Sequence, residues 1–159
     1  MTRSTFIANR LREVFLSGSW IANTNYKQQL ASITWEQAIQ KVGTLNTIAT
    51  LTYHVNYYVV GLLEVLNGGA LSIRDQYSFD LPPIQSEADW KALVQEFLSN
   101  AEQFIFQVEK IADQQLEEVF VEEKYGTYLR NLEGVIEHSY YHLGQISLIR
   151  KLIIETNKR

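Results

Sequence analysis

Apolar residues recur every three or four positions along most of the chain, the spacing that gathers them on one face of an α-helix. No run of alternating polar and apolar residues is long enough to indicate a sheet. The pattern therefore predicts an all-α protein. A first helix is expected over residues 4–22, and its buried stripe should consist of Phe6, Ile7, Leu11, Val14, Phe15 and Ile21.

The second helix is expected to be long. Thr34 followed by Gln37 fits a capping box, in which each residue's side chain accepts a hydrogen bond from the other's backbone N–H. The helix should therefore begin there, after a turn over residues 23–34. The next signal that ends a helix is an asparagine with two glycines at 67–69, so the helix should run to about Leu66.

Two further helices are expected after a long connection over residues 67–85, which contains both prolines of the chain. Connections of this length are usually crossovers or functional lids. Ser86 and Asp89 fit a second capping box and predict a helix that runs to about Ala112. Its expected buried residues are Trp90, Leu93, Val94, Phe97, Phe104, Ile105 and Val108. A fourth helix is predicted over about 127–155, with inward positions at Leu129, Leu132, Val135, Ile136, Leu143, Ile146, Ile149 and Ile153.

The lengths of the connections predict how the helices are arranged. A short first link, a long second one and a moderate third suit a four-helix bundle in which helices two and three run parallel and are joined by the crossover. The helix order would be up, down, down, up. With 159 residues, the chain is expected to form one domain over residues 1–159.

Composition and charge narrow the class of protein. The chain has 18 acidic and 14 basic residues, and the basic ones are scattered, so we expect no nucleic-acid partner. Charges interrupt the N-terminal segment MTRSTFIANRLREVFL, which argues against a signal peptide. The longest apolar stretch, YYVVGLLEVL, is well short of the roughly 20 residues that span a bilayer. We therefore expect a cytoplasmic protein without a membrane segment. Because the chain has no cysteine, any metal chemistry must use histidine, carboxylate and water.

The three histidines of the chain are predicted to converge. His138 and His142 are four residues apart on the fourth helix, so their rings share one face, close to the buried stripe. His54 lies among inward-facing positions of the second helix. His54 is about 18 Å from the end of its helix and His138 about 17 Å from the start of its own. The three rings therefore meet if the two helices are antiparallel.

Three neutral imidazoles favour a divalent transition metal, zinc or nickel first, with iron, cobalt or manganese as alternatives. Three protein ligands leave a coordination position open for water or a small-molecule substrate, which is typical of a catalytic site. From an unperturbed histidine pKa near 6.5, the metal is expected to leave as the pH falls through roughly 6 to 5. The alternative is that the histidines are core residues that hydrogen-bond to neighbours. A zincin protease is not expected, because Ser139, and not glutamate, follows His138.

The order and spacing of these features resemble the DinB-like family, also called the DinB/YfiT-like metalloenzymes. The resemblance rests on YHVNYY around His54, on HSYYH with His138 and His142, and on the long connection between helices two and three. It covers essentially the whole chain. It implies that these three histidines are the metal ligands, that the fold is the up-down-down-up bundle and that the protein is a homodimer.

The resemblance implies less about activity. The family includes S-transferases that use bacillithiol, mycothiol or glutathione, and a mycothiol-dependent isomerase, so it implies a low-molecular-weight thiol as a cosubstrate. The fold alone does not choose among these activities. Our leading hypothesis is a metal-dependent, thiol-dependent S-transferase. The rivals are a non-catalytic bundle that binds a metal or a small molecule, and a purely structural dimeric bundle.

Several other residues are weaker candidates for contact with substrate. Tyr58 lies one turn beyond the histidine of the second helix and could offer a phenolic donor. Gln145 and Asn131 lie one to two turns from the histidine pair on nearly the same face, where each could contact substrate or accept a hydrogen bond from a ligating ring. Gly61 and Gly134 could open space for a ligand or allow close helix packing. For all of these residues, ordinary packing or solvation is the alternative.

Overall fold

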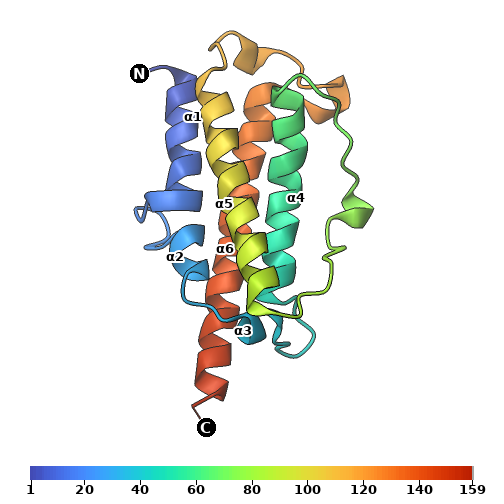
Figure 1. Ribbon diagram of the computed structural model, residues 1–159. Helices are drawn as coiled ribbons and strands as arrows, with labels where there is room; N and C mark the ends of the chain where they lie inside the picture. Colours follow the sequence, from blue (N-terminus) through green and yellow to red (C-terminus); the bar gives the residue numbers. More distant parts are fainter. Residues whose placement is uncertain (159) are drawn as a thin grey trace.

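Four long helices carry the fold, which is shown as a computed structural model in Figure 1 and is described here for residues 1–158. They are α1 (Arg3–Arg12), α4 (Ile48–Leu66), α5 (Glu87–Glu109) and α6 (Tyr128–Thr156). Within the described residues there is no strand, and the all-α prediction is confirmed. In Figure 1, α1 and α6 run downward while α4 and α5 run upward. α4 packs against both α5 and α6, and α1 packs against α5.

Short helical segments occupy most of the connections. They are the π-helical turn η1 (Glu13–Ser17), the short helices α2 (Tyr26–Leu30) and α3 (Trp35–Ile39), and the 3₁₀ turns η2 (Asp75–Tyr77), η3 (Gln115–Glu117) and η4 (Glu123–Tyr125). The crossover from α4 to α5 contains η2 and passes along the outside of α4 (Figure 1). None of the helices in the described part of the chain is long and apolar enough to cross a membrane.

The third and fourth predicted helices begin where they were expected to begin. The Ser86 side chain accepts a hydrogen bond from the Asp89 N–H at the start of α5, and the Thr127 side chain accepts one from the Arg130 N–H at the start of α6. The capping box expected of Ser86 and Asp89 is half present, because the Asp89 carboxylate accepts its hydrogen bond from the Gln85 N–H and not from the Ser86 N–H. Short polar side chains therefore set both starting points by satisfying N–H groups that have no partner inside the helix.

The first helix is shorter than predicted. Regular helix ends at Arg12 and one π-helical turn continues it to Ser17, whereas the expected range ran to residue 22. Gly18 adopts an extended conformation, and a Cβ atom there would lie 2.6 Å from the Glu13 Cα. The tight return of the chain at Gly18 therefore ends the helix. Ile21, expected in the buried stripe, is 63% exposed, and Phe6 is also exposed.

The predicted second helix is two helices. The capping box of Thr34 and Gln37 is present, but it begins only the five-residue α3, which ends at Ile39. Gly43 then adopts φ +56°, a left-handed conformation that residues with a side chain rarely adopt. Thr47 caps a new helix, α4, by accepting a hydrogen bond from the Thr50 N–H. The apolar spacing continued across this break, which is why it was missed.

An aromatic cluster joins the N-terminal segments to α5. The ring of Phe97 makes edge contacts with Phe15 and Tyr26, at centroid distances of 5.6 Å and 5.2 Å, and all three side chains are fully buried. Tyr26 belongs to a segment that was expected to be a turn, and its hydroxyl donates a hydrogen bond to the Ser139 carbonyl of α6 at 2.7 Å. This aromatic cluster therefore packs against the part of α6 that carries the two histidines.

Candidate metal centre

The three histidines meet between α4 and α6. The Nε2 atom of His138 is 3.0 Å from the Nε2 atom of His54 and 3.0 Å from that of His142. One ring nitrogen from each of the three residues lies within 4.8 Å of the other two. Tyr58, one turn after His54, contacts His138 on its ring edge. Later positions of α4 therefore meet earlier positions of α6, and the two helices are antiparallel, as the convergence requires.

Two of the rings are fixed by hydrogen bonds at their other nitrogen. The Nδ1–H group of His54 donates to the Ser78 carbonyl at 3.2 Å, and Phe79 stacks on the same ring at a centroid distance of 3.9 Å. The Nδ1–H group of His142 donates to the Gln145 side-chain oxygen at 2.7 Å. An acceptor at Nδ1 holds a histidine in the orientation and tautomer that leaves Nε2 free to bind a metal.

With these hydrogen bonds in place, the three Nε2 atoms that face one another have too few hydrogens to form hydrogen bonds among themselves. A carbonyl oxygen only accepts, so Nδ1 carries the proton in His54 and in His142, and the Nε2 atom of each neutral ring presents a lone pair. Both lone pairs face the Nε2 atom of His138, which has at most one hydrogen to donate. Hydrogen bonding within the protein therefore cannot satisfy all three nitrogens, whereas one cation between them would.

The residues fit a divalent transition metal. A metal at about 2.0–2.1 Å from each imidazole nitrogen holds neighbouring ligand nitrogens about 3 to 3.5 Å apart. Two of the three separations are 3.0 Å and lie within that range, and all three ligand nitrogens lie within 4.8 Å of one another. His54 and His142 are buried and His138 is half-buried, so a ligand would approach on the side of His138.

Burial keeps the three rings neutral. It lowers the pKa of His138 to about 4, and the neighbouring His142 and His54 add to the effect. Burial also lowers the pKa of His54 and of His142, with partial opposition from their hydrogen-bond acceptors. Protons therefore compete with a metal for these ring nitrogens less effectively than they do at histidines with an ordinary pKa. Acid release is expected below the range of pH 6 to 5 that an unperturbed pKa suggests.

The metal-free protein is expected to lose stability as the pH falls from about 7.5 to 5.5. Unfolded histidines titrate near pH 6.5, whereas the lowered pKa values keep the folded ones neutral, so the unfolded state binds more protons in this range. Urea unfolding with a chelator present, at both pH values, tests this. The difference between the urea midpoints at the two pH values should be smaller in His138→Gln than in the parent protein. Equal midpoints at both pH values for the parent protein would contradict the lowered pKa.

Replacing Gln145 by alanine is expected to weaken metal binding without abolishing it. The change removes the acceptor that orients His142, and loss of such a partner typically costs about 10- to 100-fold in metal affinity. Competition with a chromophoric chelator measures the change. Gln103→Ala, on the exposed part of α5, is the matched control and should leave the affinity unaltered. An unchanged affinity in Gln145→Ala would mean that this hydrogen bond does not support the site.

The other candidate residues have different surroundings. The Tyr58 hydroxyl donates to the Asp75 carboxylate at 2.9 Å, beside His138. The Asn131 amide nitrogen donates to the carbonyls of Tyr125 and Thr127 and makes no hydrogen bond with the histidines. Tyr58 therefore remains next to the centre, and Asn131 lies farther along α6.

The two candidate glycines serve different purposes. A Cβ atom on Gly61 would lie 2.5–2.8 Å from side-chain atoms of Ile73, so this glycine lets the crossover pack closely on α4. A Cβ atom on Gly134 would meet no atom within 4 Å. Gly134 therefore borders open space, and close packing explains only Gly61.

Sequence reasoning missed the contribution of the crossover. Ser78, Phe79 and Asp75 all contact the histidines or Tyr58, yet none was a candidate. The only signal was the length of the connection, which indicated a functional role without naming residues. The Ser78 contact uses a backbone carbonyl, which any residue type supplies, so no motif could have identified it.

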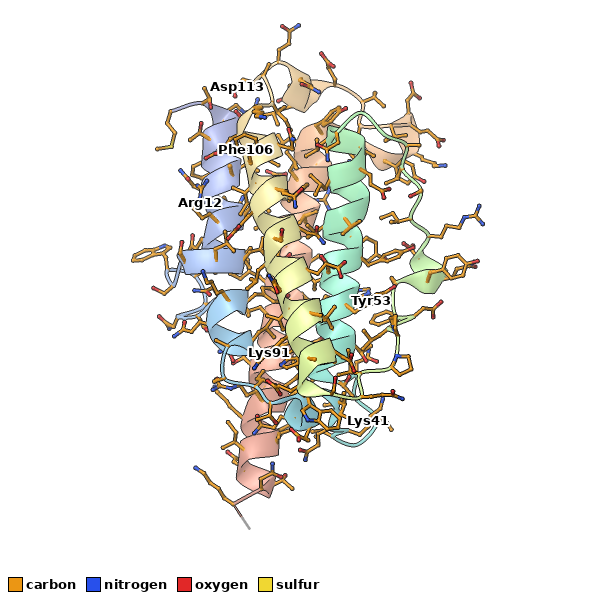
Figure 2. The ribbon with its side chains drawn as sticks, viewed as in Figure 1. Arg12, Lys41, Tyr53, Lys91, Phe106 and Asp113 are labelled. Atoms are coloured by element: carbon orange, nitrogen blue, oxygen red, sulfur yellow. The ribbon has the colours of Figure 1, made fainter. Side chains whose placement is uncertain are left out.

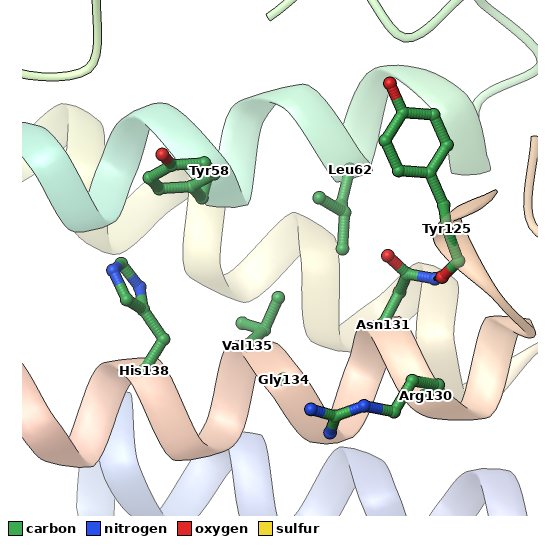
Figure 3. A pocket seen from close by; sticks show the side chains of 8 residues that line it. All are labelled: Tyr58, Leu62, Tyr125, Arg130, Asn131, Gly134, Val135 and His138. Atoms are coloured by element: carbon green, nitrogen blue, oxygen red, sulfur yellow. Dashed lines mark hydrogen bonds between the residues drawn. The ribbon is translucent and has the colours of Figure 1, made fainter. Parts of the chain in front are cut away.

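A pocket opens beside the centre (Figure 3). It has a volume of about 350 Å³, and its lining residues are Tyr58, Leu62, Tyr125, Arg130, Asn131, Gly134, Val135 and His138. Because His138 belongs to both the pocket and the histidine cluster, the pocket leads directly to the candidate metal position.

Comparisons with known proteins give no further assignment. No protein-family model, no curated protein and no solved structure matches the chain.

Proposed function

We propose that the protein binds one divalent transition metal, zinc or nickel, on His54, His138 and His142. The observation that carries this proposal is the convergence of three Nε2 atoms that have at most one hydrogen between them. Burial of the rings and the acceptors at Nδ1 support it, because both keep the rings neutral and oriented.

The proposed activity is a metal-dependent transfer to a low-molecular-weight thiol. A metal with an open position favours the thiolate form of a thiol by lowering its pKa. In the transfer, the thiol loses its proton, its sulfur forms a bond to an electrophilic carbon, and the leaving group departs with the bonding electrons. The pocket beside His138 supports the proposal because it offers the second substrate a place next to the centre.

Membership of the DinB-like family is part of the same proposal. The family's order of helices is up, down, down, up, and the directions of α1, α4, α5 and α6 in Figure 1 are compatible with it. We also propose the homodimer that this family implies, because twofold dimers are the commonest assemblies.

Metal analysis followed by thiol assays tests the proposed function. Protein grown with each candidate metal and then desalted is expected to retain about one ion per chain, and absence of metal after supplementation would overturn the proposal. The loaded and chelator-treated proteins are then assayed with bacillithiol, mycothiol and glutathione against an epoxide and an aryl halide. Metal retention without turnover of any thiol would reject the transferase and leave a non-catalytic metal-binding bundle.

A further inference from the structure

The pocket beside the candidate metal centre is long and has two different ends. His138 lies at one end and Arg130 at the other, and both project from α6 (Figure 3). Eight residues of helix correspond to about 12 Å along its axis. The volume of about 350 Å³ is at the lower end of the range for small-molecule sites. The pocket therefore suits a small molecule.

Arg130 gives the α6 side of the pocket a positive charge, because its side chain begins at the far end and runs back along α6 toward Glu137 (Figure 3). It is the one lining residue whose side chain carries a permanent charge. The Arg130 Nη1 donates to Glu137 at 3.2 Å, but both side chains are 62% exposed, so the pair is weak. The remaining N–H groups of the guanidinium are free to bind a carboxylate in its preferred paired geometry. The charge therefore selects an anionic group.

The middle of the pocket is apolar and open. Leu62 and Val135 line it from opposite helices, and Gly134 leaves the space between the two ends unfilled (Figure 3). Asn131 uses its amide hydrogens on the carbonyls of Tyr125 and Thr127, so its oxygen can only accept. An acceptor at this point disfavours a second anionic group, and the body of the ligand should therefore be neutral.

We propose that this pocket binds a small organic acid, with its carboxylate on Arg130, its apolar body over Gly134 and Val135, and its other end at His138. The proposal deepens the proposed function and rests on it, because the end at His138 is where the bound metal would meet the ligand.

A pair of thiols that differ at one end tests this proposal on the cobalt-loaded protein. The probes are 6-mercaptohexanoate and 6-mercaptohexanol, and each dissociation constant is measured from the visible absorption of cobalt, which changes when a thiolate joins its ligands. The acid is expected to bind about tenfold more tightly than the alcohol, because one partly exposed charge-assisted interaction is added. Arg130→Gln should abolish this difference, whereas Arg12→Gln, at another exposed ion pair, should keep it.

Filling the pocket provides a second test in the same helix. Gly134→Leu places a side chain in the open space and should weaken both probes at least tenfold. Gly144→Leu is the matched control, because a Cβ atom there also meets nothing within 4 Å but Gly144 does not line the pocket. Its dissociation constants should equal those of the parent protein.

The cobalt content of each variant separates the two proposals. If the parent protein takes up no cobalt, the proposed function fails and the pocket proposal fails with it. If cobalt is bound but the acid and the alcohol bind equally well, or Arg130→Gln preserves their difference, the organic-acid pocket is rejected while the metal centre stands.

Discussion

Replacing His54 by alanine is expected to abolish stoichiometric metal binding. The change removes the only ligand that α4 contributes and leaves His138 and His142, which come from a single helix. Loss of a partner that merely orients a ligand costs about 10- to 100-fold in affinity, so loss of the ligand itself should exceed about 100-fold. Elemental analysis after desalting should find about one ion per chain in the parent protein and almost none in the variant.

The variant Phe79→Ala separates ligation from packing. His54→Ala also removes the ring on which Phe79 stacks, so a disturbed crossover would be a second explanation for a loss of metal. Phe79→Ala disturbs the same contact but keeps all three imidazoles, and it should retain about one ion per chain. Equal metal retention by His54→Ala and the parent protein, with both folded by circular dichroism, would rule out this centre.

The convergence of the histidines was predictable because helical geometry is regular. The spacing of His138 and His142 fixes their common face, and the rise per residue fixes their height relative to His54. The break before α4 did not disturb this argument, since the height of His54 was counted from the end of its helix at Leu66. The structure accordingly brings the three rings together although the predicted start of that helix was wrong.

The parts that the sequence did not reveal depend on irregular backbone. The break near Gly43 replaced one predicted helix by two, and only the conformation of that glycine distinguishes it from a tolerated helical glycine. The crossover contacts at Ser78 and Phe79 depend on how a long loop folds back on α4, which no periodicity describes. Arg130 had no candidate role because its relation to the pocket exists only once α4 and α6 are paired.

Replacing Phe97 by alanine is expected to cause the largest loss of stability. Phe97 is fully buried and contacts the rings of Phe15 and Tyr26, so one side chain holds η1 and α2 against α5. Truncation of a buried phenylalanine typically costs about 3–5 kcal/mol, because both hydrophobic transfer energy and packing are lost. The free energy of unfolding is measured in urea with a chelator present, since bound metal would add its own stabilisation.

The matched control lies on the same helix. Phe106 of α5, labelled in Figure 2, is 56% exposed. The ammonium group of Lys110 lies over its ring, 3.8 Å from the centroid, so Phe106→Ala should cost no more than about 1 kcal/mol. The two variants lose the same atoms from the same element, and they differ in burial. If both lower the free energy of unfolding equally, the aromatic cluster is not what fixes the N-terminal segments to the bundle. A large loss in Phe97→Ala alone would show that the packing against the histidine-bearing part of α6 depends on this one ring.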